Sequence, residues 1–143
     1  MNFPKKVLLI DDDEDEYDIF TAALNACCKG VVELIYEKNA KSALLRMAND
    51  DADARAEMVF LDWRMPLMSG RDVLTGIRQL PYYTLIPIVI FTGLLDPVHL
   101  KEAKELGATF LMEKPFDLAD LGQKLEYLFS LDWKQVKHTG QQI

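Results

Sequence analysis

The chain has 143 residues, of which half are hydrophobic and 27% are charged, and its formal net charge is −7. These values suit one folded domain of ordinary size, and the acidic balance argues against direct binding to nucleic acid or to an anionic membrane. No apolar run approaches the roughly 20 residues of a membrane-spanning helix, and the N-terminus lacks the apolar stretch of a secretory signal. We therefore expect a single cytoplasmic domain over residues 1–143, with a core over about 5–130 and a tail over 131–143.

Short apolar segments alternate with amphipathic segments along the chain. The apolar segments predict strands at 5–10, 31–37, 58–62, 86–92 and 109–113. Helical spacing predicts helices at 14–28, 40–50, 70–80, 96–107 and 117–131, with the polar tail extending or fraying the last one. This order predicts an α/β fold, a doubly wound five-stranded parallel sheet with five flanking helices.

Polar residues stand where four of the predicted strands end. They are Asp11 and Asp12 after the first strand, Asp62 after the third, Thr92 in the fourth and Lys114 after the fifth. A single acid in such a place is often a helix cap, but capping does not easily explain acid, hydroxyl and ammonium groups on four strands. In open α/β sheets the functional groups gather at the carboxyl ends of the strands. We therefore expect these side chains to form one charged site.

Four segments resemble the motifs of a known family. They are "LLIDDD" (8–13), "FLDWRMPLMSG" (60–70), "PIVIFTG" (87–93) and "GATFLMEKPF" (107–116). In this order and spacing, they are similar to the response-regulator receiver domain, the phosphoacceptor module of two-component signalling. The resemblance covers residues 5 to about 130 and implies the flavodoxin-like receiver fold in a stand-alone, single-domain form.

The resemblance also implies roles for the acidic residues. Asp62 would accept a phosphoryl group from a sensor histidine kinase or a histidine phosphotransfer protein. Asp11, Asp12, Asp62 and the backbone carbonyl of Arg64 would hold Mg²⁺ or Mn²⁺. Such a cation is needed because two unit charges about 4 Å apart repel by roughly 4 kcal/mol at an effective dielectric constant near 20. Oxygen ligands of this kind suit Mg²⁺.

The other implied roles concern the ends of the fourth and fifth strands. Thr92 would contact a phosphoryl oxygen, and Lys114 would pair with Asp62 or with its phosphoryl group. The Lys114–Pro115 bond is expected to be cis, which an X-Pro bond tolerates. The protein would be a switch that assists its own phosphorylation and dephosphorylation, rather than an enzyme. It would signal by protein contact or onward transfer, as a monomer or a weak phosphorylation-dependent dimer with an unknown downstream target.

The sequence departs from the family pattern at Leu111, where receivers commonly carry Tyr or Phe. Phe110 cannot substitute for it, because neighbouring side chains of a strand point to opposite faces. We therefore expect the loop over 93–97 to carry the conformational switch. The alternative is that Leu111 is a surface residue of an ordinary switch.

Some residues are expected to have lesser roles. Trp63 and Arg64 would lie on the rim of the loop, either as surface residues or, for Arg64 together with Leu94, lining the approach of an attacking water. The adjacent Cys27 and Cys28 are expected to be buried helix thiols that do not bridge each other, because adjacent Cα atoms lie closer together than a disulfide normally holds them. We assign no chemistry to the two histidines.

Two alternative functions remain open from the sequence. The stretch "LLIDDDED" also resembles a haloacid-dehalogenase-like phosphatase, with Asp11 as nucleophile and Asp13 as acid. Asp15 stands where that family usually has Thr or Val, and this interpretation leaves the 60–70 segment unexplained. The other alternative is a flavodoxin-like cofactor binder, but acidic strand ends would repel a phosphate in the absence of a metal.

Overall fold

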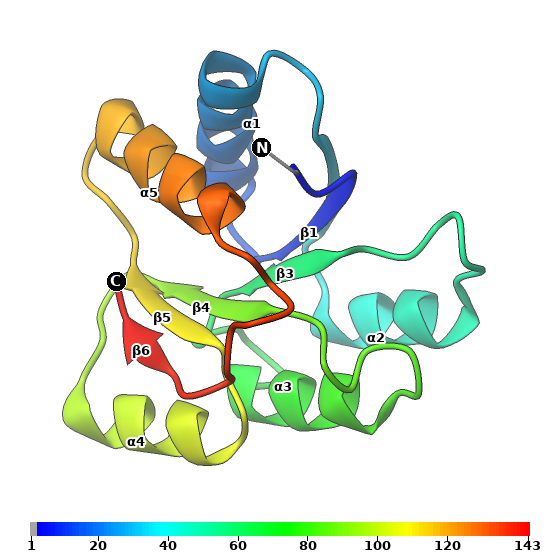
Figure 1. The fold of residues 1–143 in the computed structure, drawn as a ribbon. Helices are drawn as coiled ribbons and strands as arrows, with labels where there is room; N and C mark the ends of the chain where they lie inside the picture. Colours follow the sequence, from blue (N-terminus) through cyan, green and yellow to red (C-terminus); the bar gives the residue numbers. More distant parts are fainter. Residues whose placement is uncertain (1–2) are drawn as a thin grey trace.

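A parallel sheet between two layers of helices forms the protein in the computed structural model, which describes residues 3–143 (Figure 1). The strands are β1 (Lys6–Ile10), β2 (Glu33–Glu37), β3 (Met58–Leu61), β4 (Ile88–Thr92), β5 (Phe110–Glu113) and β6 (Gln141–Gln142). Their spatial order is β2-β1-β3-β4-β5-β6, and every pairing is parallel. The predicted doubly wound sheet is confirmed, and the two-residue β6 is an addition to it.

In the described part of the chain, residues 3–143, five helices cover the sheet. They are α1 (Glu14–Cys28), α2 (Ala40–Asn49), α3 (Gly70–Gln79), α4 (Pro97–Glu105) and α5 (Leu118–Ser130). Each begins after an Asp, Asn or Ser side chain that accepts a backbone N–H of the first turn, which fixes where the helix starts. Helices α1 and α5 lie on one face of the sheet, and α2, α3 and α4 lie on the other (Figure 1).

The two faces of the sheet carry separate cores. Under α1 and α5, the rings of Phe20, Phe60 and Phe91 meet edge to face, with centroids 4.8–6.2 Å apart. Phe110 belongs to this core, whereas its neighbour Leu111 is fully buried in the core under α2, α3 and α4. The expected opposite orientation of Phe110 and Leu111 is confirmed, and the alternative that Leu111 is a surface residue is wrong.

The predicted helical extension of the tail is wrong. Helix α5 ends at Ser130, and Leu131 is already in an extended conformation (φ −74°, ψ 149°). The chain then crosses to the outer edge of β5, where the Ile143 N–H donates to the Leu111 carbonyl at 2.9 Å. Trp133 packs edge to face against Phe110 on the way, with ring centroids 5.9 Å apart. Apolar contacts and strand pairing therefore direct a segment whose composition is mostly polar.

Two expectations from the sequence concern membranes and thiols. Across residues 3–143, no helix is both long enough and apolar enough to cross a bilayer. Cys27 and Cys28 lie in the last turn of α1 as free thiols, and Cys28 is buried. The two residues are helix thiols as expected, but the expected burial holds for Cys28 alone, because Cys27 is half-buried.

Candidate functional site

Three carboxylates meet at the carboxyl ends of β1 and β3. These strands are neighbours, and the Asp62 N–H donates to the Ile10 carbonyl at 2.9 Å, which places Asp62 beside Asp11. Asp11 is fully buried and Asp62 is 5% exposed, while Asp12 lies at the surface. One carboxylate oxygen from each of Asp11, Asp12 and Asp62 lies within 4.8 Å of the others. The structure therefore brings together the acids that the sequence singled out.

Lys114 reaches this cluster from the end of β5. Its Nζ lies 2.7 Å from Asp11 Oδ2 and 3.8 Å from Asp62 Oδ2. The ammonium group also lies 3.9 Å from Glu16 Oε1 in the first turn of α1, an acid that sequence reasoning missed. The sequence feature that could have pointed to Glu16 is its position about one helical turn after Asp12, on a helix that starts at the acid cluster. Three carboxylates, those of Asp11, Glu16 and Asp62, thus surround one ammonium group, and Asp12 adds a fourth carboxylate to the cluster.

The predicted cis Lys114–Pro115 bond is wrong, because no peptide bond over residues 3–143 is cis. The Lys114 N–H donates to the Thr92 carbonyl at 2.7 Å, which continues the pairing of β4 and β5 by one residue. This extended strand end already directs the Lys114 side chain toward Asp11 and Asp62. No reversal of the chain at Pro115 is needed to place the ammonium group.

Burial controls the protonation of these acids. Burial, followed by the charge of Asp11, raises the pKa of Asp62 to about 6, against the opposing effects of Lys114 and the Arg64 N–H. Burial also raises the pKa of Asp11 and Glu16. Burial of Lys114 favours its neutral amine, but the hydrogen bond to Asp11 and the surrounding carboxylates raise its pKa overall. The excess of negative charge suits an additional cation.

Thr92 presents an unused hydroxyl at the end of β4. Its side chain is 1% exposed, and its Oγ1 lies close enough to Asp62 to lower the pKa of that carboxyl, although the two groups lack the geometry of a formed hydrogen bond. Buried hydroxyl groups in native proteins nearly always have a partner, so an orphan needs an explanation. A hydroxyl group free to donate beside buried acids fits an incoming oxyanion.

The loop after β3 holds Asp62 tightly. Trp63 is only 5% exposed, so the expectation that it lies on the rim is wrong; the ring packs into the core under α2, α3 and α4. The Gly70 N–H donates to the Trp63 carbonyl at 3.0 Å and closes the loop. The Arg64 N–H points back to Asp62 Oδ1 at 3.3 Å. The loop therefore fixes the orientation of the Asp62 carboxylate.

The Arg64 side chain points to α4. Its guanidinium group pairs with Asp96 at 3.0 Å, and Asp96 also accepts from the His99 backbone N–H at 3.0 Å as the N-cap of α4. The His99 N–H and the nearby cations hold the pKa of Asp96 below its usual value. Leu94 is 54% exposed in the loop between β4 and α4. The role of Arg64 and Leu94 toward an attacking water stays a prediction.

Substitution of Gly70 by Ala tests the closure of this loop. A Cβ at Gly70 would lie 2.7 Å from the Trp63 Cα and 3.0 Å from the Asp62 carbonyl oxygen, so the backbone must shift. We expect Gly70→Ala to lower the free energy of unfolding by about 1–3 kcal/mol, measured by urea denaturation. The matched control is Gly122→Ala in α5, where a Cβ meets nothing within 4 Å; this change is expected to stabilise by about 0.5–1 kcal/mol. Equal effects of the two substitutions would contradict the close packing at Gly70.

The sequence model of the response regulator receiver domain family matches residues 7–126. Among curated proteins, the two-component response regulator ORR1 of rice (Oryza sativa subsp. japonica) is 26% identical over 119 residues, which cover 81% of this chain. The match covers 52% of ORR1, so the chain spans about half the length of this relative.

Solved structures show the same fold. A crystal structure of the Vibrio cholerae chemotaxis protein CheY4 is 27% identical and has a TM-score of 0.72, covering 85% of this chain and 96% of CheY4. The Mn²⁺-bound form of the response regulator Rcp1 is 24% identical with a TM-score of 0.73, covering 94% of this chain and 98% of Rcp1. Nothing in these comparisons supports the phosphatase alternative, and Asp13 serves as the N-cap of α1, where its carboxylate accepts from the Asp15 N–H at 3.0 Å.

Proposed function

Since this chain belongs to the response regulator receiver domain family, a family of phosphoacceptor switches in two-component signalling, we propose that Asp62 is its phosphoacceptor. We further propose that Asp11, Asp12, Asp62 and the backbone carbonyl of Arg64 hold a divalent cation, Mg²⁺ or Mn²⁺. The observation that carries this proposal is the buried Asp62 carboxylate, which lies between two other acids and the Lys114 ammonium group. Hard oxygen donors clustered in this way are those that such cations prefer.

The side chains of the site divide the work of phosphoryl transfer. An Asp62 oxygen attacks the phosphorus atom, the P–O bond forms, and the P–N bond to the donor histidine breaks, which leaves an acyl phosphate on Asp62. A bound cation supplies charge neutralisation and a ligand position for a phosphoryl oxygen. Lys114 offers positive charge and the orphan hydroxyl of Thr92 offers a hydrogen bond to the phosphoryl group. These groups mainly position and neutralise the transferred group, so the protein acts as a switch rather than as an enzyme.

The phosphodonor in this proposal is a sensor histidine kinase or a histidine phosphotransfer protein in the cytoplasm. Phosphorylation adds about −1.5 to −2 charges at neutral pH, and the Thr92 hydroxyl at the end of β4 is a donor without a formed hydrogen bond. Movement of Thr92 toward the phosphoryl group would pull on the loop over 93–97, which leads directly into α4. We propose that this loop carries the switch to a protein target.

Metal dependence tests the proposed site. With a small phosphodonor such as acetyl phosphate, we expect labelling in the presence of Mg²⁺ and a fall to background when a chelator is added, read on a phosphate-affinity gel. Asp12→Asn removes one charged ligand and should raise the Mg²⁺ concentration needed for half-maximal labelling by roughly tenfold or more.

The matched control for this experiment is Asp15→Asn. Asp15 is also an exposed acid near the start of α1, but it is not one of the three clustered carboxylates. This variant should keep the wild-type requirement for Mg²⁺. Labelling that the chelator leaves undiminished, or an equal shift in both variants, would overturn the proposed metal site.

A further inference from the structure

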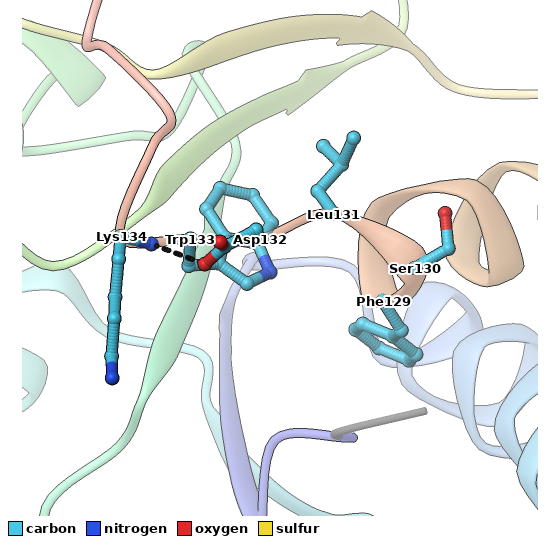
Figure 2. A pocket seen from close by; sticks show the side chains of 6 residues that line it. All are labelled: Phe129, Ser130, Leu131, Asp132, Trp133 and Lys134. Carbon is cyan, nitrogen blue, oxygen red and sulfur yellow. Dashed lines mark hydrogen bonds between the residues drawn. The ribbon is translucent and has the colours of Figure 1, made fainter.

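The C-terminal segment over 132–143, here called the strap, leaves α5 and runs to the open edge of β5 (Figure 1). Figure 2 shows its start, where the Lys134 N–H donates to Asp132 Oδ1 at 3.1 Å beside the ring of Trp133. Its end pairs with β5 through the Gly140 N–H to the Thr109 carbonyl at 3.2 Å and the Ile143 N–H to the Leu111 carbonyl at 2.9 Å. The strap thus occupies the edge of the sheet.

His138 anchors the strap through a hydrogen bond whose direction is fixed. The fully buried hydroxyl of Thr109 accepts from the Ile88 N–H at 3.0 Å and from Arg78 Nη2 at 3.3 Å. Both lone pairs are then in use, so its single hydrogen must go to His138 Nδ1, which lies 2.6 Å away. Nδ1 must therefore be an unprotonated acceptor, and the neutral imidazole carries its hydrogen on Nε2.

The charged groups around His138 oppose a second proton. From α3, Arg78 Nη2 lies 3.4 Å from Nδ1, and the guanidinium group is fixed there by the Gly107 carbonyl at 2.8 Å. From α4, the carbon atoms of the Lys104 stem lie against Gly140, two residues along the strap. Lys137 stands next to His138 in the strap itself. Within residues 3–143, no carboxylate pairs with His138. Burial, followed by the charge of Arg78, lowers the pKa of His138.

We propose that His138 is a pH-sensitive latch: the neutral imidazole holds the strap on β5, and protonation of Nδ1 releases it. A proton on Nδ1 would face the hydroxyl hydrogen of Thr109 and the cationic Arg78, so it replaces a hydrogen bond with repulsion. Because docking lowers the pKa of His138, docking is fully stabilised above the unperturbed histidine pKa of about 6.5 and is weakened as the pH falls below it.

Release of the strap changes what the protein can bind. The Thr109 and Leu111 carbonyls lose the N–H partners that Gly140 and Ile143 supply, which leaves β5 as an unpaired edge between α4 and α5. Unpaired edges accept extended strands from other chains. The strap therefore protects this edge at neutral pH, independently of the chemistry at Asp62.

Hydrogen exchange of the strap at two pH values tests this inference. His138→Asn places Oδ1 where Nδ1 lies, so it keeps an acceptor for Thr109 but cannot become charged near neutral pH. At pH 7.5 we expect peptides from the strap to exchange alike in the wild type and the variant. At pH 5.0 the wild type should exchange faster than the variant, by at most about thirtyfold, because pH 5.0 lies about 1.5 units below the unperturbed histidine pKa of about 6.5 and each unit is a factor of ten. Comparison at the same pH cancels the intrinsic pH dependence of exchange.

An NMR titration of the histidines in the wild-type protein tests the latch without relying on the variant. We expect His138 to show the Nε2–H tautomer and to titrate below the unperturbed histidine pKa of about 6.5, with loss of strap protection at the same midpoint. Equal exchange of wild type and variant at pH 5.0 would overturn the latch. If the variant already loses protection of the strap at pH 7.5, the wild-type titration is the deciding test. Strap protection that does not follow the titration of His138 would then overturn the latch.

Discussion

Replacement of Asp62 by Asn will abolish phosphoryl labelling by a small phosphodonor in the presence of Mg²⁺. The amide of Asn has nearly the shape of the carboxylate, but it cannot form an acyl phosphate. The substitution also removes a buried charge whose pKa is already raised to about 6, so we expect the metal-free variant to melt at the wild-type temperature or slightly above it. Labelling is measured on a phosphate-affinity gel, and melting by circular dichroism.

The control for this prediction is Asp18→Asn, which makes the same chemical change at an exposed position of α1. This variant should be labelled as the wild type is. Stable labelling of Asp62→Asn at the wild-type level would show that another residue accepts the phosphoryl group, and it would refute the assignment of Asp62.

Replacement of Lys114 by Met will slow labelling by a factor of about 10²–10³, the usual effect of removing one group that stabilises transition-state charge. Met keeps much of the length of the side chain but lacks the ammonium group that lies 2.7 Å from Asp11 and 3.8 Å from Asp62. Without this cation the buried acids repel one another, so the metal-free variant should also melt at a lower temperature than the wild type. Addition of Mg²⁺ should recover part of this loss, because it restores positive charge at the same acids.

Lys101→Met on the exposed side of α4 is the matched control, since no acid lies within ion-pair distance of Lys101 in the described part of the chain. Its labelling rate and its melting temperature should stay close to the wild-type values. A Lys114→Met protein that is labelled at the wild-type rate would contradict a role for the ammonium group in the transfer.

The sequence predicts the parallel sheet well because each core strand is buried on both faces. Such strands are nearly continuous apolar runs between amphipathic helices, and their polar ends then share one edge of the sheet. For this reason the sequence alone predicts one shared site for four side chains, those of Asp11, Asp62, Thr92 and Lys114. Their chemical roles came from the resemblance to a family, and the geometry alone does not assign them.

Other features depend on contacts that no local pattern contains. Trp63 follows the acceptor in a loop and looks exposed, but Gly70 draws the loop inward and buries the ring. The sequence of the strap is mostly polar, yet the Trp133 ring packs against Phe110. His138 contacts Thr109 and a guanidinium group from α3. Each of these contacts joins residues far apart in sequence or depends on a neighbour's exact shape. Local composition therefore gives no signal for them.

Chemical trapping of the phosphorylated residue in the wild-type protein tests the central claim most directly. Borohydride reduces an acyl phosphate to an alcohol, so a phosphorylated aspartate becomes homoserine, which peptide mass spectrometry locates. After Mg²⁺-dependent labelling we predict homoserine at position 62 alone, with Asp11 and Asp12 unchanged. Homoserine at Asp11 or Asp12, or a stable label that borohydride does not remove, would contradict the assignment of Asp62 as the phosphoacceptor.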